Sequence, residues 1–257
     1  MKPKRKIHIP TLQEILDSVN SPKPTALSKD SFYIFQMSEV KKTLSKGYLK
    51  FLMDSGYSPN LNDASEIGIA KSILQINQAV KDSAQQAGLT IGNDGVYLVN
   101  INHANGKKIV EAMGYKLPTA GLMYKLFIPW LKSQAEQNNP EAKATLNEMT
   151  NTKAEWLEDL ILNKNALMMG SKKIALTLPQ KYGRFDRAEI NEYGYPTAVK
   201  DAGEFYYWYP KGDKMAAVRG GGSGLGLLLD WGPSDAGGVL GVRAIFFPEE
   251  IRTSKIK

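Results

Sequence analysis

The sequence predicts an α+β fold, with helices mainly in the first half of the chain and strands in the second. Apolar residues recur at helical spacing in several stretches before residue 132, whereas short runs rich in valine, isoleucine, phenylalanine and tyrosine dominate after Lys172. The chain has 257 residues, of which 42% are hydrophobic, so it can bury a sizeable core. We therefore expect a basic leader and a short helix over residues 1–30, followed by one domain over residues 31–257.

The expected helices follow from apolar spacing and from capping residues. Asn102 is a good N-cap for a helix whose apolar face includes Ile109, and Gly114 stands where a C-cap glycine belongs. Thr119 can cap the helix that follows. The polar residues 133–150 are expected to leave the packed core as an excursion. Further helices are predicted over residues 12–19, 38–53 and 63–87.

Strands are predicted where runs of β-branched and aromatic residues lie between turn residues. These runs cover residues 96–101, 174–178, 205–209, 214–218 and 239–247. Between the helical and strand-rich halves, Glu155, Glu158 and Asp159 are most simply the solvated face of a helix, because charged side chains are costly to bury.

The most informative stretch is residues 219–243, RGGGSGLGLLLDWGPSDAGGVLGVR, which has no helical period. Its first glycines permit tight backbone paths and the close approach of another chain, and Pro233 and Ser234 then turn the chain. A phosphate-binding loop would need glycines at G-x-G-x-x-G or G-x-x-x-x-G-K-[ST] spacing between a strand and a helix, and neither spacing occurs. The stretch is therefore predicted to be a loop carried between two strands.

The two ends of this stretch are Arg219-Gly220-Gly221 and Gly241-Val242-Arg243. They resemble the C-terminal signature of the C-type lectin fold in its formylglycine-generating-enzyme form, in which R-G-G-x-W opens a loop and G-F-R closes it. The stretch also resembles the variable region of diversity-generating retroelement proteins, which runs L-x-L-x-x-x-P-S and then I-G-F-R. The matching positions are Leu227, Leu229, Pro233, Ser234, Leu240, Gly241 and Arg243.

A second match lies upstream, where this family has V-N-V-S-W, a helix and then G-K-R-L-P-T. The chain has Val99-Asn100-Ile101-Asn102-His103 and then Gly114-Tyr115-Lys116-Leu117-Pro118-Thr119. Weaker matches are Phe32-Tyr33-Ile34 with Glu39-Val40, and Glu155-Trp156. The chain departs from the pattern at Ser223, where the family has tryptophan, in lacking G-N before E-W, and in a shorter loop after Gly226.

The resemblance implies a non-enzymatic binding protein that displays a diversified C-terminal loop for receptor or host-surface recognition. Diversification replaces adenines in asparagine codons, so the family implies glycine, leucine, aspartate, valine or serine at binding positions. By alignment the displayed positions are Gly222, Gly224, Leu225, Leu228, Asp230, Asp235, Gly237, Gly238 and Val239, with Trp231 beside them as an aromatic anchor. Leu225, Leu228 and Trp231 would then form an exposed cluster of the kind that marks a partner site. Arg219 and Arg243 are expected to be framework residues, satisfied by backbone carbonyls or carboxylates.

Catalytic and metal chemistry are disfavoured by the residues that are missing. Formylglycine-generating enzymes use cysteines, and this chain has none. Relatives that bind iron need clustered histidines, whereas the chain has only His8 and His103, and His103 is expected to pack at a surface where a helix starts. We expect no catalytic residue, no metal ligand and no cofactor, with structural calcium left open. The alternatives are an enzyme or a calcium-dependent carbohydrate binder on the same fold, or a structural virion subunit; the lectin motifs E-P-N, Q-P-D and W-N-D are absent.

The net charge of +7 comes largely from scattered lysines and from the basic run at residues 2–6, which favours a solvated terminus over a nucleic-acid-binding arm. No signal peptide and no transmembrane run is readable in the sequence. The expected partner is therefore a macromolecule, most simply a protein, rather than nucleic acid or membrane, and the expected location is cytoplasmic or virion-associated. The sequence does not set the ligand or the oligomeric state.

Overall fold

The structure is a computed structural model of the chain. It describes residues 27–91, 98–151, 154–221, 224–236 and 240–247. These residues form six α-helices and two β-sheets, one of three strands and one of eight. The predicted α+β class is thus confirmed, while the helix predicted over residues 12–19 lies outside the described residues. Within the described ranges, no helix has the length and apolar character that crossing a membrane requires.

The small sheet joins segments from both ends of the chain, in the order β1-β2-β11. Its strands are β1 (Phe32–Gln36), β2 (Glu66–Ala70) and β11 (Ile245–Phe246). The helix predicted over residues 63–87 is wrong in its first part, because Ile67 and Ile69 are fully buried in a strand paired on both sides. Only the last part is helical, as α4 (Gln78–Gln86), which begins where the Asn77 side chain accepts a hydrogen bond from the Val80 amide at 3.0 Å.

The other helices follow their capping residues. The helix predicted over residues 38–53 is two helices, α2 (Met37–Thr43) and α3 (Lys46–Asp54), because Ser45 caps the second. The predicted caps of α5 (His103–Ala112) are confirmed: Asn102 accepts from the Asn105 amide at 2.9 Å, and Gly114 has a φ of 81°. Thr119 accepts from the Leu122 amide at 3.3 Å, where a π-helical segment, η2 (Leu122–Phe127), leads into α6 (Ile128–Glu136).

The polar residues after α6 are helical, so the excursion predicted over residues 133–150 is wrong. Asn139 caps α7 (Pro140–Thr150), and proline at the first helical position favours the start of a helix. Ala142, Thr145 and Met149 lie on the buried side of α7 at helical spacing, while the polar side faces outward. The polar composition of this region therefore reflects a thin apolar stripe rather than an absence of packing.

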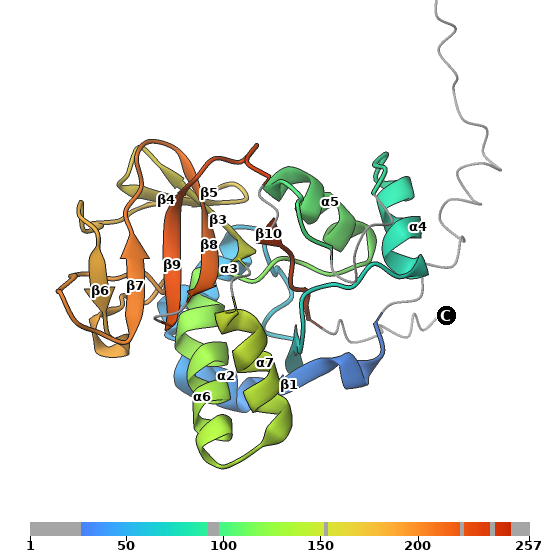
Figure 1. Cartoon of the computed structure of the whole chain (residues 1–257), viewed down its shortest axis with the longest axis horizontal. Helices are drawn as coiled ribbons and strands as arrows, with labels where there is room; N and C mark the ends of the chain where they lie inside the picture. The colour runs from blue at the N-terminus through green and yellow to red at the C-terminus, as the bar shows by residue number, and fades with distance from the viewer. Residues whose placement is uncertain (1–26, 92–97, 152–153, 222–223, 237–239, 248–257) are drawn as a thin grey trace, which may run out of the picture.

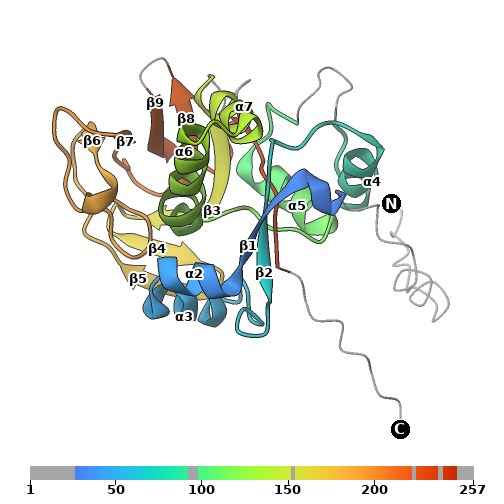
Figure 2. The same cartoon turned by 90° about the horizontal axis from the view of Figure 1, so that it is seen from below.

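The large sheet has the order β5-β4-β3-β8-β9-β7-β6, and β10 pairs with β3 beside that path (Figure 1). Its strands are β3 (Ala154–Leu162), β4 (Ala166–Met169), β5 (Lys172–Ala175), β6 (Gly183–Phe185), β7 (Phe205–Trp208), β8 (Lys214–Gly221), β9 (Gly224–Trp231) and β10 (Leu240–Gly241). Two short 3-10 helices, η1 (Lys29–Ser31) and η3 (Arg187–Glu189), complete the described elements. Figures 1 and 2 both place β6 and β7 at one end of the molecule and α4 at the other.

The large sheet packs against a hydrophobic core on each face. One core contains side chains of α2, α3, η2, α6 and α7 together with Leu225, Leu227 and Leu229 of β9. The other contains side chains of α5 together with Trp156 of β3 and Leu228 of β9. Because side chains alternate between the faces of a strand, β9 contributes leucines to both cores.

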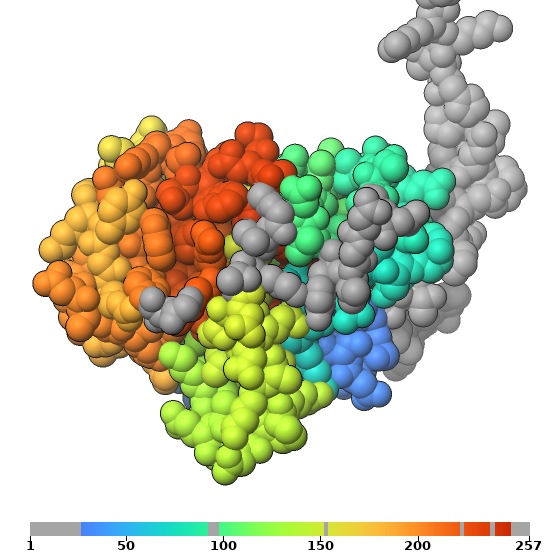
Figure 3. Space-filling view, viewed as in Figure 1, coloured from blue at the N-terminus to red at the C-terminus, as the bar shows by residue number. Residues whose placement is uncertain are grey.

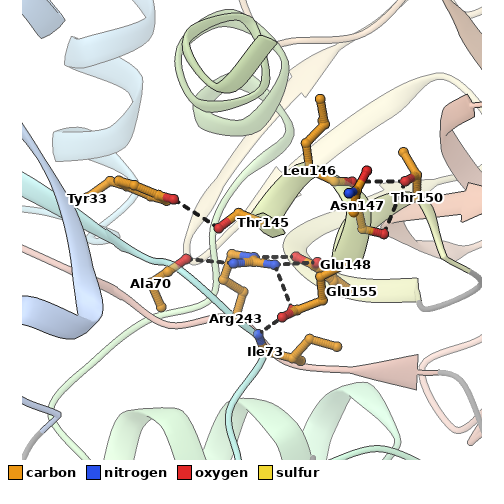
Figure 4. Close-up of polar contacts among 10 residues, drawn as sticks. All are labelled: Tyr33, Ala70, Ile73, Thr145, Leu146, Asn147, Glu148, Thr150, Glu155 and Arg243. Carbon is orange, nitrogen blue, oxygen red and sulfur yellow. Dashed lines mark hydrogen bonds and ion pairs between the residues drawn. The ribbon is translucent and has the colours of Figure 1, made fainter. Parts of the chain in front are cut away.

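A buried ion pair ties the two regions that carry the family resemblance (Figure 4). Arg243 is fully buried and donates to both carboxylate oxygens of Glu155, at 2.7 and 2.8 Å, to the Ala70 carbonyl at 2.6 Å and to Glu148 at 3.3 Å. The framework role predicted for Arg243 is therefore confirmed. The solvated helix face predicted for Glu155, Glu158 and Asp159 is wrong, because these residues belong to β3 and the distant Arg243 supplies the counter-charge for Glu155.

The same region shows that the end of the 219–243 stretch returns to its beginning. Ala154 of β3 pairs with Arg219 of β8 on one side and with Leu240 of β10 on the other. Gly241 bridges Val99, so the upstream motif also contacts the downstream one. The motifs lead us to expect that the strand after Gly241 pairs near the strand that ends at Val218, and this is wrong, because that strand, β11, pairs with β2 in the small sheet.

Candidate functional site

The predicted binding loop is in large part a strand. Residues 224–231 form β9, which pairs along its length with β8, so the loop predicted over residues 219–243 is wrong for this part. Gly224, Leu225, Leu228, Asp230 and Trp231 lie on β9, and Asp235 lies in an exposed turn after it, where its carboxylate accepts from the Gly232 amide at 2.6 Å. Gly222, Gly237, Gly238 and Val239 lie outside the described residues.

The expected exposed cluster of Leu225, Leu228 and Trp231 is wrong for both leucines. Each is only 2% exposed, Leu225 in the core beneath the helices and Leu228 in the core that contains Trp156. The reason is that β9 is an interior strand of the sheet, and its middle is covered on both faces. Trp231 is half-buried, as are Gly224 and Asp230.

A β-bulge near the end of β9 decides where Trp231 points. Leu228 pairs with Ala217, but Trp231 pairs with Met215, so β9 has one more residue than β8 over this interval. The extra residue places Trp231 on the same face as Leu228, instead of the opposite one. The Trp231 ring consequently contacts the Trp156 ring edge to face, with 6.2 Å between the centroids.

The strand register aligns four residues in one row across β6, β7, β9 and β8. Arg184 pairs with Tyr206, Tyr206 with Gly226, and Gly226 with Arg219. Paired residues on neighbouring strands share a face, and strands lie about 4.8 Å apart, so the two arginines are anchored roughly 14 Å apart. The next row on this face contains Trp208. We call Arg184, Tyr206, Trp208, Gly226, Arg219 and Trp231 the aromatic face.

The rings of the aromatic face are only partly covered. Tyr206, Trp208 and Trp231 are half-buried and Arg219 is exposed. Figure 1 shows β6, β7 and β9 side by side with no helix in front of them, and Figure 3 shows the orange-to-red surface of this part of the chain on the viewed side, next to α5. Trp208 and Trp231 also pack against the core that contains Trp156. The outer edges of the rings form a surface open to a partner.

The side chains of this face support one another. The Arg184 guanidinium lies 3.8 Å from the centroid of the Tyr206 ring and donates to the Gly203 carbonyl at 2.8 Å. The Tyr206 and Trp208 rings are 5.6 Å apart. Gly226 is needed beneath them, because a Cβ at this position would lie 2.7 Å from Tyr206 Cβ and 3.2 Å from the Trp208 ring. The rings therefore close over the strand and hold a fixed arrangement.

Two charged groups at this face lack the partners that such groups usually have. Arg219 is paired through its backbone with Ala154 and Gly226, but its exposed side chain makes no hydrogen bond and no ion pair with another described residue. Asp230, in the bulge, has a buried Oδ1 that accepts no hydrogen bond within the described residues. Burial raises the pKa of Asp230, against the opposing effect of Lys214, Arg219 and Lys211. The Asp230 Oδ1 is buried and so is not presented to a ligand, whereas the exposed Arg219 guanidinium is.

A second polar cluster lies inside the molecule, around Asp159 of β3. The carboxylate is buried and accepts from the Ala120 amide at 2.8 Å, and burial raises its pKa to about 7. The Tyr48 and Tyr195 hydroxyls lie near it, and their pKa values are well above the ordinary value, mainly through burial. Tyr48 is hydrogen-bonded to Thr119. This cluster joins α3, β3 and the segment before β7, and its side chains are buried.

His103 was expected at the surface, and that prediction is wrong. It is 7% exposed, its Nε2 lies 2.9 Å from the Leu157 carbonyl oxygen, and its ring packs edge to face on Trp156. Burial lowers the pKa of His103 to about 4. The described residues contain no group of three or more histidine, cysteine, aspartate or glutamate side chains placed to hold a metal ion.

Comparison of the chain with protein-family models, curated proteins and solved structures gives no match. The site therefore has to be judged on its own geometry. Sequence reasoning identified Trp231 and its neighbours but missed Tyr206, Trp208 and Arg184. The signal for two of them is the alternation in FYYWY, residues 205–209, in which every second ring points to the same face.

Proposed function

We propose that this protein is a non-enzymatic binding protein that recognises a macromolecular ligand, most simply a protein, through the aromatic face. The main support for this proposal is the row of residues that crosses four strands, Arg184, Tyr206, Gly226 and Arg219, with Trp208 beside it. Tryptophan, tyrosine and arginine are the residues that most often dominate binding energy at protein interfaces. Rings that are half-covered and braced from below lose little conformational freedom on binding.

The proposed scaffold is a C-type lectin fold of the formylglycine-generating-enzyme type, as the sequence motifs imply. The buried Arg243–Glu155 pair and the bridge between Val99 and Gly241 support it, because both join motif segments that are far apart in the sequence. On such a scaffold the framework and the binding face occupy different parts of the sheet. We further propose that the chain is a variable protein of the diversity-generating retroelement class.

The burial of β9 narrows the set of positions that could be diversified. Leu225 and Leu228 are core residues, so we no longer propose them as diversified positions. Gly224 and Asp230 stay because they are half-buried, and Asp235 stays because it is exposed, while Trp231 remains the aromatic anchor beside them. A near-identical repeat of the C-terminal coding sequence beside a reverse transcriptase gene would support this part of the proposal; a genome that has neither would contradict it.

The binding role can be tested with a random 12-residue peptide library displayed on phage. Clones selected on the wild-type protein should bind the Trp208→Ala variant at least about thirtyfold more weakly, the loss typical of a central interface anchor. Tyr182→Ala is the matched control, because Tyr182 is 51% exposed but contacts Tyr209, which packs on the core of the opposite face. Clones that bind Trp208→Ala as well as wild type would refute the aromatic face as the recognition surface.

A further inference from the structure

The indole N–H groups of the aromatic face indicate which chemistry a ligand must bring. The buried Trp156 donates its indole N–H to the Ile101 carbonyl at 2.8 Å, as a buried tryptophan usually does. The indole N–H groups of Trp208 and Trp231, in contrast, donate to no residue within the described ranges. Neither indole nitrogen is among the buried polar atoms that lack a partner, so both nitrogens reach the surface. Each is therefore a hydrogen-bond donor that a ligand can use.

The aromatic face presents donors and few acceptors. An indole N–H and a guanidinium can only donate, and the exposed Arg219 side chain adds a guanidinium to the two indoles. Arg184 does not count among these donors, because its guanidinium is already engaged, by the Gly203 carbonyl and the Tyr206 ring among others. No residue of the aromatic face has a carboxylate or an amide side chain. A ligand for this face must therefore be rich in acceptors and poor in donors, because a donor buried against another donor stays unsatisfied.

We infer, on the basis of the proposed function, that the aromatic face binds a proline-rich polypeptide segment in the polyproline II conformation. Proline has no backbone N–H but keeps its carbonyl, so such a segment offers acceptors and few donors. Its carbonyls make no hydrogen bonds within the polyproline II helix. Proline-rich segments also dock on aromatic side chains, and their preformed conformation loses little entropy on binding. The indole N–H groups of Trp208 and Trp231 and the Arg219 guanidinium donate to the carbonyls of the ligand.

The sheet register sets the spacing of the two indoles. Trp208 of β7 pairs with Leu228 of β9. On β8, the partner of Leu228 is Ala217, and the partner of Trp231 lies two residues before it. Neighbouring strands lie about 4.8 Å apart and rise about 3.3 Å per residue, so the two tryptophans are anchored about 8 Å apart. A polyproline II helix advances about 9 Å per turn of three residues. The expected ligand motif is therefore two prolines at positions i and i+3, one on each indole.

An oligosaccharide is another ligand that stacks on exposed aromatic rings, and the same donor pattern disfavours it. Each sugar hydroxyl is a donor as well as an acceptor, so a sugar also needs acceptors beside the rings. The side chains of the aromatic face do not supply the carboxylate or amide oxygens that would accept from hydroxyl groups. The Oδ1 of Asp230, in the adjoining bulge, is buried. A proline-rich segment needs no such acceptor.

The test uses the 12-residue phage library on wild type, Trp208→Phe, Trp208→Ala and Trp130→Phe proteins, with a thermal melt of each variant to establish that it is folded. Trp208→Phe keeps an aromatic ring and removes the indole N–H. We expect enriched peptides to carry prolines at i and i+3 and to bind Trp208→Phe about tenfold more weakly, the effect of one lost hydrogen bond. Trp130→Phe is the matched control and should bind as wild type does, because the Trp130 ring packs on Tyr33 and Phe35 in the core of the opposite face.

Two ligands are then titrated separately, a synthetic peptide from the selection and cellohexaose. Replacing both prolines of the peptide with alanine should weaken its binding to wild type by about tenfold or more, because the alanines add two amide donors and release the fixed conformation. Cellohexaose should not bind in the concentration range in which the peptide does.

The outcomes separate this inference from the proposed function. Peptides that need Trp208 but carry no proline pair overturn the proline-rich ligand and leave the binding face intact. Proline-containing peptides that bind Trp208→Phe as well as wild type also overturn it, because the indole N–H is then not used. Cellohexaose that binds more tightly than any selected peptide, and that needs Trp208, overturns it as well. A library that yields no peptide sensitive to Trp208→Ala overturns both proposals together.

Discussion

Replacing Arg243 with methionine should lower the free energy of unfolding by about 3–5 kcal/mol, because it leaves a buried carboxylate without its counter-ion. Glu155 is 1% exposed and receives two hydrogen bonds from Arg243. The substitution also removes the donors to Glu148 and to the Ala70 carbonyl. Methionine fills much of the space of the aliphatic part of arginine. The change in the free energy of unfolding therefore reports the loss of the charge more than the formation of a cavity.

Equilibrium urea denaturation measures this loss, and Arg219→Met is the matched control. Arg219 is exposed, so its replacement should change the free energy of unfolding by about 0.5 kcal/mol or less. Adding Glu155→Gln to Arg243→Met should recover part of the loss, because the buried charge is gone, with a coupling of about 0.5–3 kcal/mol. An Arg243→Met protein within about 1 kcal/mol of wild type, or strict additivity of the two substitutions, would show that this pair does not hold the framework.

Four further results are expected. Leu228→Ala should cost about 2–5 kcal/mol in urea denaturation, because Leu228 is a core residue, and a change under about 0.5 kcal/mol would place it back at the surface. Gly226→Ala should destabilise the protein by about 1–3 kcal/mol, since the new Cβ meets Tyr206, and a melting temperature equal to that of wild type would contradict the close packing. The pKa of Asp159 is raised in the folded state to about 7, from an ordinary value of 3.8, so its contribution to stability is present below pH 4 and is lost as the pH rises towards 7; melting temperatures of Asp159→Asn and wild type should diverge most at pH 8. The pKa of His103 is lowered from 6.5 to about 4, so neutral His103 favours folding above pH 6.5 and this contribution is lost as the pH falls towards 4. The melting temperature of His103→Gln should therefore decrease less than that of wild type as the pH falls. An identical pH dependence of the two melting temperatures would refute the assignment.

The sequence predicted correctly those helix ends that are determined by capping residues close by in the chain. Asn102 and Gly114 delimit α5 through contacts within a few residues, and the sequence shows both ends. The helix prediction over residues 63–87 was wrong in part because isoleucines at 67, 69 and 73 are compatible with a strand as well as with a helix. What decides between them is the pairing of β2 with β1 and β11, and the β11 partner lies at the far end of the chain. The spacing of apolar residues within one segment cannot reveal a pairing strand that is distant in the sequence.

The charged residues of β3 were predicted to be exposed for the same physical reason, namely that their partners are distant in the sequence. Glu155 and Asp159 can be buried only because Arg243 and the Ala120 amide, both distant in sequence, satisfy their carboxylates. Without those partners, exposure is the less costly state, and the local sequence does not show that the partners exist. The motif positions of Glu155 and Arg243 were visible in the sequence, but the contact between them became evident only in the fold.

Only half of the candidate site was predicted from the sequence. The glycine-rich segment was recognised, but its leucines were taken for display residues, because three consecutive leucines on a strand do not reveal that both faces are covered. The rings that complete the site, Tyr206 and Trp208, come from the neighbouring strand β7. The middle of β9 is therefore buried on both faces, and its partly exposed residues, Gly224, Asp230 and Trp231, lie at the two ends of the strand. Substitutions at Gly224 or Asp230 should therefore change the proposed binding more than the stability, because neither residue belongs to the two cores, whereas Trp231 packs on Trp156 and its substitution should change both.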